Sequence, residues 1–152
     1  MAIRYRKSPP AILSLIGVLL IGCGPSPLMG DWEGEWDVDG VRFDVELEVA
    51  DPADGYQNVR GELSLSGDSW ELSGSMNDRR KRKGEEYELN EWMECDRETC
   101  SLLSVEGGGS LWINADFSDD MDEIEGEGVL VEYGIGDEED IVLDGDIELE
   151  RD

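Results

Sequence analysis

Along most of the chain, apolar and polar residues alternate one by one. In residues 41–49, five apolar side chains from Val41 to Val49 alternate with Arg42 and three acids. A period of two places these two sets on opposite faces of a β-strand, so it predicts a strand with one buried and one solvated face. No window carries a sustained helical stripe. Further strands are predicted at residues 59–65, 70–76, 87–93, 111–117 and 141–149, although Glu91 interrupts one apolar face.

Turn sequences separate these runs. Asp39-Gly40 and Gly67-Asp68 are two-residue links that favour primed hairpin turns, and Gly107-Gly108-Gly109 allows another tight reversal. Short links connect neighbouring strands, so the pattern predicts an antiparallel meander of eight or nine strands. Because an open meander leaves two exposed edges, we predict an all-β fold closed into an up-and-down barrel. A β-sandwich is the alternative.

The start of the first predicted strand carries a short motif. Gly30-Asp31-Trp32 resembles the Gly-x-Trp opening of lipocalin-like barrels, and Trp32-Glu33-Gly34 is similar to the first strand of avidin-like barrels. The resemblance implies that Trp32 closes one end of the barrel and that Arg151, near the chain end, pairs with it. It implies nothing about a ligand.

A basic and then apolar segment precedes the alternating region. Residues 11–22 are an apolar run of about twelve residues, too short for a transmembrane helix, which needs roughly twenty. The run ends in Leu20-Ile21-Gly22-Cys23, which resembles the lipobox of bacterial lipoproteins. This resemblance implies cleavage after Gly22 and fatty acyl chains, such as palmitate, on Cys23. An ordinary secretory signal is the alternative.

The predicted organisation follows from this cleavage. Residues 1–22 form the signal peptide, residues 23–30 the lipidated N-terminus and tether, and residues 31–152 an acidic β-barrel domain. The tether reaches at most about 26–29 Å, which keeps the domain near its membrane. Residue 24 is Gly rather than Asp, which in lipoproteins similar to this one favours the outer membrane. We therefore expect a lipid-anchored protein of the cell envelope.

The strongly negative net charge of the chain limits the kinds of molecule that the domain can bind. The chain carries −27, and removal of residues 1–22 takes away three basic residues and no acid, which leaves −30. So negative a domain repels nucleic acid and anionic lipid, but it permits cationic partners. The simpler interpretation is that the charge keeps the domain soluble.

Two cysteines remain once Cys23 is acylated. Cys95 and Cys100 are separated by four residues, and outside the cytoplasm a disulfide between them is the default. If the segment is a hairpin, the two cysteines lie opposite each other across its strands. A redox or metal pair is the alternative, but the spacing is not Cys-x-x-Cys.

Tryptophans and a basic run are the candidate binding residues. We predict that Trp32, Trp36 and Trp70 point inward and line a pocket for an apolar or amphipathic ligand, while Trp112 points outward. Core packing is the alternative. A basic loop is a candidate contact for an anionic surface, with a solvated hairpin loop as the alternative; its residues are Arg79, Arg80, Lys81, Arg82 and Lys83.

Catalysis and metal binding receive little support. Residues 116–123 and 137–140 are acidic enough to suggest calcium, but neither has EF-hand spacing, and a solvated acidic turn is the default. The chain has no histidine, which removes the Ser-His-Asp triad and imidazole metal sites. A carboxylate pair stays formally possible, but no pair stands out among 39 acids. We predict no enzymatic activity, cofactor or metal.

The predicted function is that of a non-enzymatic, lipid-anchored envelope barrel that binds a small apolar or amphipathic ligand or an envelope protein. The alternative is a structural or interaction lipoprotein that has no pocket and acts through its surface charge. A carboxylate-dependent hydrolase is the least favoured hypothesis.

Overall fold

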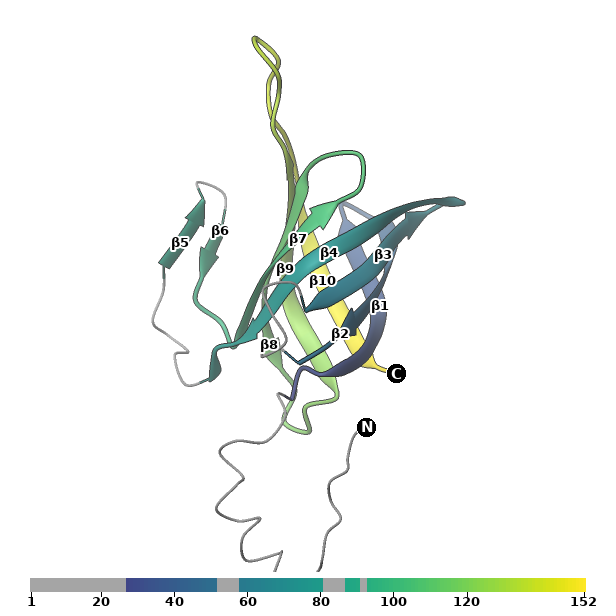
Figure 1. Cartoon of the computed structure of the whole chain (residues 1–152), viewed down its shortest axis with the longest axis vertical. Coiled ribbons are helices and arrows are strands. Elements are labelled where there is room, and N and C mark those ends of the chain that lie inside the picture. Colours follow the sequence, from purple (N-terminus) through teal and green to yellow (C-terminus); the bar gives the residue numbers. More distant parts are fainter. Residues whose placement is uncertain (1–26, 52–57, 81–86, 91–92) are drawn as a thin grey trace, which may run out of the picture.

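The computed structural model describes residues 27–51, 58–80, 87–90 and 93–152, and these residues form β-strands joined by turns and loops (Figure 1). In these ranges no helix is long and apolar enough to cross a bilayer. The described strands are β1 (Gly30–Val38), β2 (Val41–Val49), β3 (Val59–Leu65), β4 (Asp68–Asp78), β5 (Tyr87–Asn90), β6 (Met93–Cys95), β7 (Thr99–Val105), β8 (Ser110–Phe117), β9 (Glu123–Glu132) and β10 (Ile141–Arg151).

Eight of these strands close into an antiparallel barrel. Their order around the barrel is β1-β10-β9-β8-β7-β4-β3-β2. Apart from the seam that closes β10 onto β1, each seam joins consecutive barrel strands. The predicted meander and its closure into an up-and-down barrel are therefore confirmed, and the sandwich alternative is excluded.

The excursion between β4 and β7 departs from the prediction. Residues 87–93 were expected to form one strand of the meander, but β5 ends at Asn90 and β6 begins at Met93. These two strands pair with each other in a separate two-stranded sheet. The single strand predicted at residues 87–93 is therefore wrong, and the barrel continues at β7.

Two tight turns use the backbone geometry expected of primed hairpins. Asp39 and Gly40 have φ angles of 51° and 89°, as the sequence predicted for this link. Ser66 and Gly67 have the same pair of angles. The second turn is thus Ser66-Gly67 rather than Gly67-Asp68, because Asp68 already belongs to β4.

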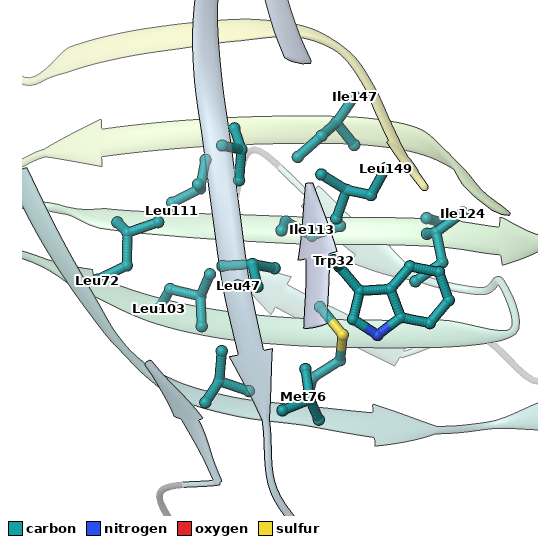
Figure 2. Close-up of a cluster of buried hydrophobic side chains, with 14 of the residues drawn as sticks. Trp32, Leu47, Leu72, Met76, Leu103, Leu111, Ile113, Ile124, Ile147 and Leu149 are labelled. Atoms are coloured by element: carbon teal, nitrogen blue, oxygen red, sulfur yellow. The ribbon is translucent and has the colours of Figure 1, made fainter. Parts of the chain in front are cut away.

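Apolar side chains from all eight barrel strands fill the interior, and Figure 2 shows part of this cluster. Each fully buried aliphatic or aromatic side chain stabilises the fold by about 1.5–3 kcal/mol relative to an exposed one. The largest fully buried side chains are Trp32, Trp36, Leu28, Leu72, Met76, Leu103, Leu111, Ile113, Ile124, Ile147, Leu149 and Val45.

A glycine lets the first strand pass very close to its neighbour. A Cβ on Gly34 of β1 would lie 1.9 Å from the carbonyl oxygen of Glu148 in β10. No side chain fits at that distance, so the tight coiling at the closing seam requires glycine here.

One end of the barrel is closed by Trp32 and Arg151. The guanidinium carbon of Arg151 lies 4.3 Å from the centre of the Trp32 ring. The same guanidinium donates hydrogen bonds to the carbonyl oxygens of Met29 (2.7 Å), Pro27 (2.5 Å) and Met121 (3.1 Å). The expected pairing of Arg151 with Trp32 is present. It also fixes residues 27–29, from which the tether would continue, at this closed end.

We expect Arg151→Met to lower the free energy of unfolding by about 2–4 kcal/mol. The substitution removes the cation–π contact and leaves three carbonyl oxygens without their charged donor. Urea unfolding followed by tryptophan fluorescence measures the change. Arg60→Met is the matched control, because Arg60 is exposed on β3, and it should stay within about 0.5 kcal/mol. Similar losses in both variants would contradict the closing role of Arg151.

Candidate functional site

The outer face of the barrel carries a row of glutamates that crosses six adjacent strands. Alternation places acids on the outside of each strand, and the strand register then aligns them side by side. All six side chains are exposed. From β4 through β3, β2, β1 and β10 to β9, the row consists of Glu71, Glu62, Glu46, Glu33, Glu150 and Glu123.

A second row runs parallel to the first and also contains only acids. It crosses β2, β1, β10, β9 and β8 through Asp44, Glu35, Glu148, Glu125 and Asp116. A shorter third row joins Asp37, Asp146 and Glu127 on β1, β10 and β9. We call the surface formed by these three rows the acidic face.

Few cations offset the acidic face, and they lie at its margins. Arg42 contacts Glu35 at 3.7 Å and Asp37 at 3.4 Å, and Arg97 contacts Asp116 at 3.3 Å. Within the described part of the chain, no glutamate of the first row has a basic group at ion-pair distance. The centre of the face therefore carries uncompensated negative charge.

Such an arrangement opposes folding. Directly opposed residues of an antiparallel pair have Cβ atoms about 4.5–5.5 Å apart, and like charges at that spacing are destabilising. Along the β1–β10 seam this occurs three times in succession, at Glu33–Glu150, Glu35–Glu148 and Asp37–Asp146. The barrel holds these charges together because the apolar residues on the opposite side of each strand fix the register.

The acidic face is hollowed in two places. One open groove of about 510 Å³ runs over β8, β9 and β10, where Glu125, Glu127 and Glu148 are among its lining residues. The other, of about 520 Å³, lies over β1, β2 and β3, and Glu33, Glu46 and Glu62 are among its lining residues. Each groove also has one arginine in its lining, Arg97 in the first and Arg60 in the second, but six acidic residues surround it in each case. This excess of carboxylates suits a lysine or arginine side chain.

Two of the three tryptophans predicted to line a pocket lie in the filled core. Trp32 and Trp36 are 1% and 0% exposed. Their indole N–H groups donate to the carbonyl oxygens of Leu28 (2.8 Å) and Gly128 (3.0 Å). Neither ring offers surface or a free donor to a ligand, so their assignment to an open pocket is wrong. Trp70 is half-buried.

The interior around Trp36 is closely packed. A Cβ on Gly128 would lie 2.9 Å from the Trp36 ring nitrogen, so only glycine leaves room for the indole. Phe43 packs on Trp36 with ring centres 5.1 Å apart, and Trp70 follows at 6.5 Å from Phe43. Aromatic rings thus continue from the core toward the barrel end opposite Trp32.

Trp112 points outward, as predicted. It joins a small outer cluster on β8, β9 and β10, together with Met93 from β6, Val129, Val131 and Val142. The β5–β6 hairpin therefore packs against the outside of the barrel through Met93. Trp92 lies outside the described residues.

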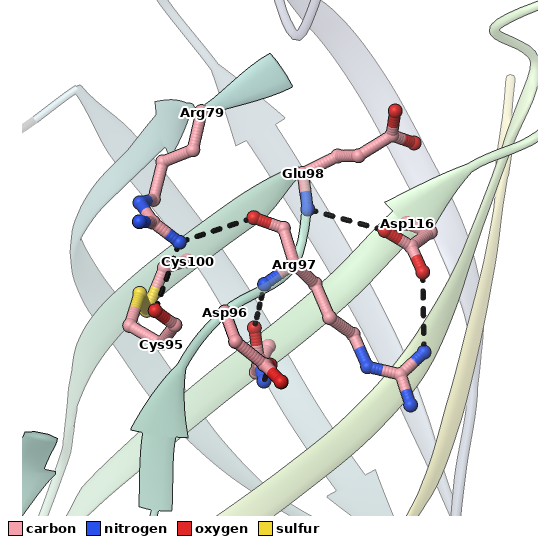
Figure 3. Close-up of a disulfide and its surroundings, with 8 residues drawn as sticks. Arg79, Cys95, Asp96, Arg97, Glu98, Cys100 and Asp116 are labelled. Atoms are coloured by element: carbon pink, nitrogen blue, oxygen red, sulfur yellow. Dashed lines mark hydrogen bonds and ion pairs between the residues drawn. A yellow bond between two sulfur atoms is a disulfide. The ribbon is translucent and has the colours of Figure 1, made fainter. Parts of the chain in front are cut away.

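The predicted disulfide is present between Cys95 and Cys100, whose Cα atoms are 5.9 Å apart (Figure 3). The hairpin interpretation of this segment is wrong, because β6 and β7 do not pair with each other. Cys95 ends the outer hairpin and Cys100 lies in the barrel strand β7. The bond therefore attaches the β5–β6 hairpin to the barrel.

Arg79, the first residue of the predicted basic surface, is buried beside the disulfide. Arg79 is 7% exposed, and its guanidinium donates to the carbonyl oxygens of Cys95 (2.9 Å) and Arg97 (3.2 Å) (Figure 3). It is a structural residue, so its assignment to an anionic surface is wrong.

Arg80 is exposed but already engaged. It contacts Asp78 at 2.9 Å, and its guanidinium carbon lies 5.7 Å from the Phe117 ring centre. The hydrogen bond with Asp78 raises the pKa of Arg80. Lys81, Arg82 and Lys83 lie outside the described residues, as does the predicted lipidation site Cys23.

The acidic loop after β8 is a hydrogen-bonded turn. The Asp120 carboxylate accepts from the Ser118 hydroxyl (2.7 Å) and from the Asp122 backbone N–H (3.2 Å). These bonds lower the pKa of Asp120. Among the residues that the structure describes, no three Cys, Asp or Glu side chains are placed to hold a metal ion.

Comparison with known proteins adds no assignment. No family model matches the chain, and neither a curated protein nor a solved structure matches it.

We expect Cys95→Ser/Cys100→Ser to free the outer hairpin while leaving the barrel folded. Loss of this short covalent loop costs about 2 kcal/mol on the chain-entropy account. Hydrogen exchange should rise in β5 and β6 and change little in β1 and β10. The reduced wild-type protein is the matched control and should give the same pattern. Equal loss of protection throughout the barrel would contradict this role.

Proposed function

We propose that this protein is a non-enzymatic, lipid-anchored protein of the cell envelope whose barrel presents the acidic face to a cationic partner protein. The observation that carries the proposal is the unbroken row of six exposed glutamates across β4, β3, β2, β1, β10 and β9.

Solubility alone is a weaker account of this arrangement. Dispersed acids would keep a domain soluble equally well, without like charges opposed across the seams. Residues that reduce stability without serving the fold are typical of functional surfaces. A face of one charge sign would attract a basic partner at long range and accelerate its association.

The filled interior also favours a surface function. Trp32 and Trp36 occupy the space in which a small ligand was expected, and both of their N–H groups bond to the protein's own carbonyls. The outer surface, in contrast, offers two acidic grooves over neighbouring strands. These grooves would receive basic side chains of the partner.

A lipid anchor would also orient the acidic face. Residues 27–29 are fixed at the closed end by Trp32 and Arg151. With acyl chains on Cys23, the short tether would hold this closed end toward the membrane, and the strands of the acidic face would rise from it. Of the predicted basic surface, only residues 81–83 remain as candidates for contact with lipid head groups.

Glu33→Gln/Glu46→Gln/Glu150→Gln, at the centre of the first row, should raise stability and weaken binding together. Each relieved like-charge pair adds about 0.2–1 kcal/mol to the free energy of unfolding. Affinity for oligolysine, measured by calorimetry at low salt, should fall, and its salt dependence should become less steep.

The matched control removes the same charge elsewhere. Glu94→Gln/Asp119→Asn/Asp144→Asn neutralises three exposed acids that lie outside the rows. It should leave stability and oligolysine affinity close to those of the wild type. Equal weakening by both triple variants would show that only net charge matters, and the acidic face would then lose its assigned role.

The lipid anchor on Cys23 can be tested separately from the acidic face. Wild-type chain expressed in a bacterium should carry acyl chains on Cys23 and fractionate with membranes, because several chains give stable anchoring. Cys23→Ser should lack them, as measured by intact mass and by detergent partition. An unmodified wild-type Cys23 in a processed chain would contradict the lipid anchor and leave the secretory alternative.

A further inference from the structure

The end of the barrel opposite Trp32 is ringed by partly exposed apolar side chains. They belong to strand positions that alternate with outward-facing polar residues, in continuity with the core. Val41 and Ile141 are 46% and 53% exposed, and an aromatic pair, Phe43 and Trp70, lies deeper. We call this ring the apolar mouth; it comprises Val38, Val41, Phe43, Trp70, Val105, Leu130, Ile141 and Leu143.

The β9–β10 hairpin extends the apolar mouth beyond the barrel. Figure 1 shows this hairpin rising above the other turns at this end. Tyr133 is 58% exposed and Ile135 is 82% exposed. Large apolar side chains so exposed on a projecting hairpin are typical of a contact surface.

Acids surround the apolar mouth. At least one exposed carboxylate lies in or directly beside each of the four turns at this end: Asp39, Asp68 at the start of β4, Glu106 and the run Asp137, Glu138, Glu139 and Asp140. Arg42, beside the first of these turns, is paired with Glu35 and Asp37. The barrel end thus has an apolar centre and an acidic rim.

We propose that the apolar mouth docks a cationic partner protein by packing against an apolar side chain that the partner presents among lysines or arginines. This inference rests on the proposed function and names the specific contact within it. The inference is based on charge complementarity. The acidic rim attracts basic residues and the apolar centre buries an apolar side chain, and protein interfaces usually combine an apolar centre with a polar rim.

Two other occupants fit the charges poorly. A second copy of this chain would bring another acidic rim and a net charge of −30 after processing, so two mouths repel each other. Anionic lipid head groups are repelled by the same rim. The mouth also lies at the end opposite residues 27–29, hence away from the membrane that the tether would reach.

The test compares two peptides of equal charge. Both are short lysine peptides, one with a central phenylalanine and one with a central alanine, and they are titrated into the lipidated full protein in nanodiscs of zwitterionic lipid. Empty nanodiscs give the blank. Trp70 provides the local readout through acrylamide quenching, and Trp70→Phe identifies its share of the fluorescence.

We expect the phenylalanine peptide to bind about tenfold more tightly, which corresponds to burial of one apolar side chain. It should also protect Trp70 from quenching. Val41→Ser/Ile141→Ser should abolish the tenfold preference while leaving affinity for the alanine peptide unchanged. Leu102→Ser is the matched control: Leu102 is 39% exposed on β7, outside the apolar mouth, and its substitution should keep the preference.

Equal affinities for the two peptides would overturn the docking site, as would a tenfold preference that survives Val41→Ser/Ile141→Ser. A dimer seen by light scattering and lost in Ile141→Ser would assign the mouth to a second copy and also overturn it. If neither peptide binds at low salt, the proposed function itself fails. If both peptides bind with equal affinity and added salt weakens their binding, the proposed role of the acidic face is retained and only the docking role of the apolar mouth is contradicted.

Discussion

The seam between β1 and β10 is the constraint on which the rest of the structure depends. It closes the meander into a barrel, and it requires Gly34 because any side chain there would meet the Glu148 carbonyl. Trp32 and Arg151 contact each other at the closed end of the barrel and fix residues 27–29 there. The same seam brings Glu33, Glu35 and Asp37 opposite three other acids. Closure of the fold and concentration of charge thus have one origin.

The alternation of apolar and polar residues was sufficient to predict the meander and its closure. Residues 41–49 and 59–65 fold as predicted, with the same bounds. The excursion was not predictable from that pattern, because residues 87–93 alternate as a barrel strand would. Whether such a run joins a long sheet or folds back on itself depends on contacts distant in sequence. The strand at residues 123–132 was equally hard to predict, because glycines at positions 126 and 128 replace half of its apolar face.

The candidate site was harder to predict than the fold. Each strand shows its acids plainly, but no single strand shows that Glu33 will lie beside both Glu46 and Glu150. That alignment is a property of register across strands far apart in the sequence. Trp36 was assigned to a pocket because an inward-pointing indole can either line a ligand pocket or pack in the core. Its contact with Gly128, on a strand distant in the sequence, shows that it packs in the core. The signal in the sequence was Gly128, a glycine at an inward-facing strand position, which leaves room for a large ring in the core.

The fold holds opposed carboxylates together against their mutual repulsion. The most direct measurement is the free energy of urea unfolding at neutral pH as sodium chloride is raised from about 0.01 M to 1 M, over which the screening length falls from about 30 Å to 3 Å. We expect the free energy of unfolding to increase by at least about 2 kcal/mol, because several like-charge pairs are screened at once. A free energy that stays constant or falls would contradict this expectation.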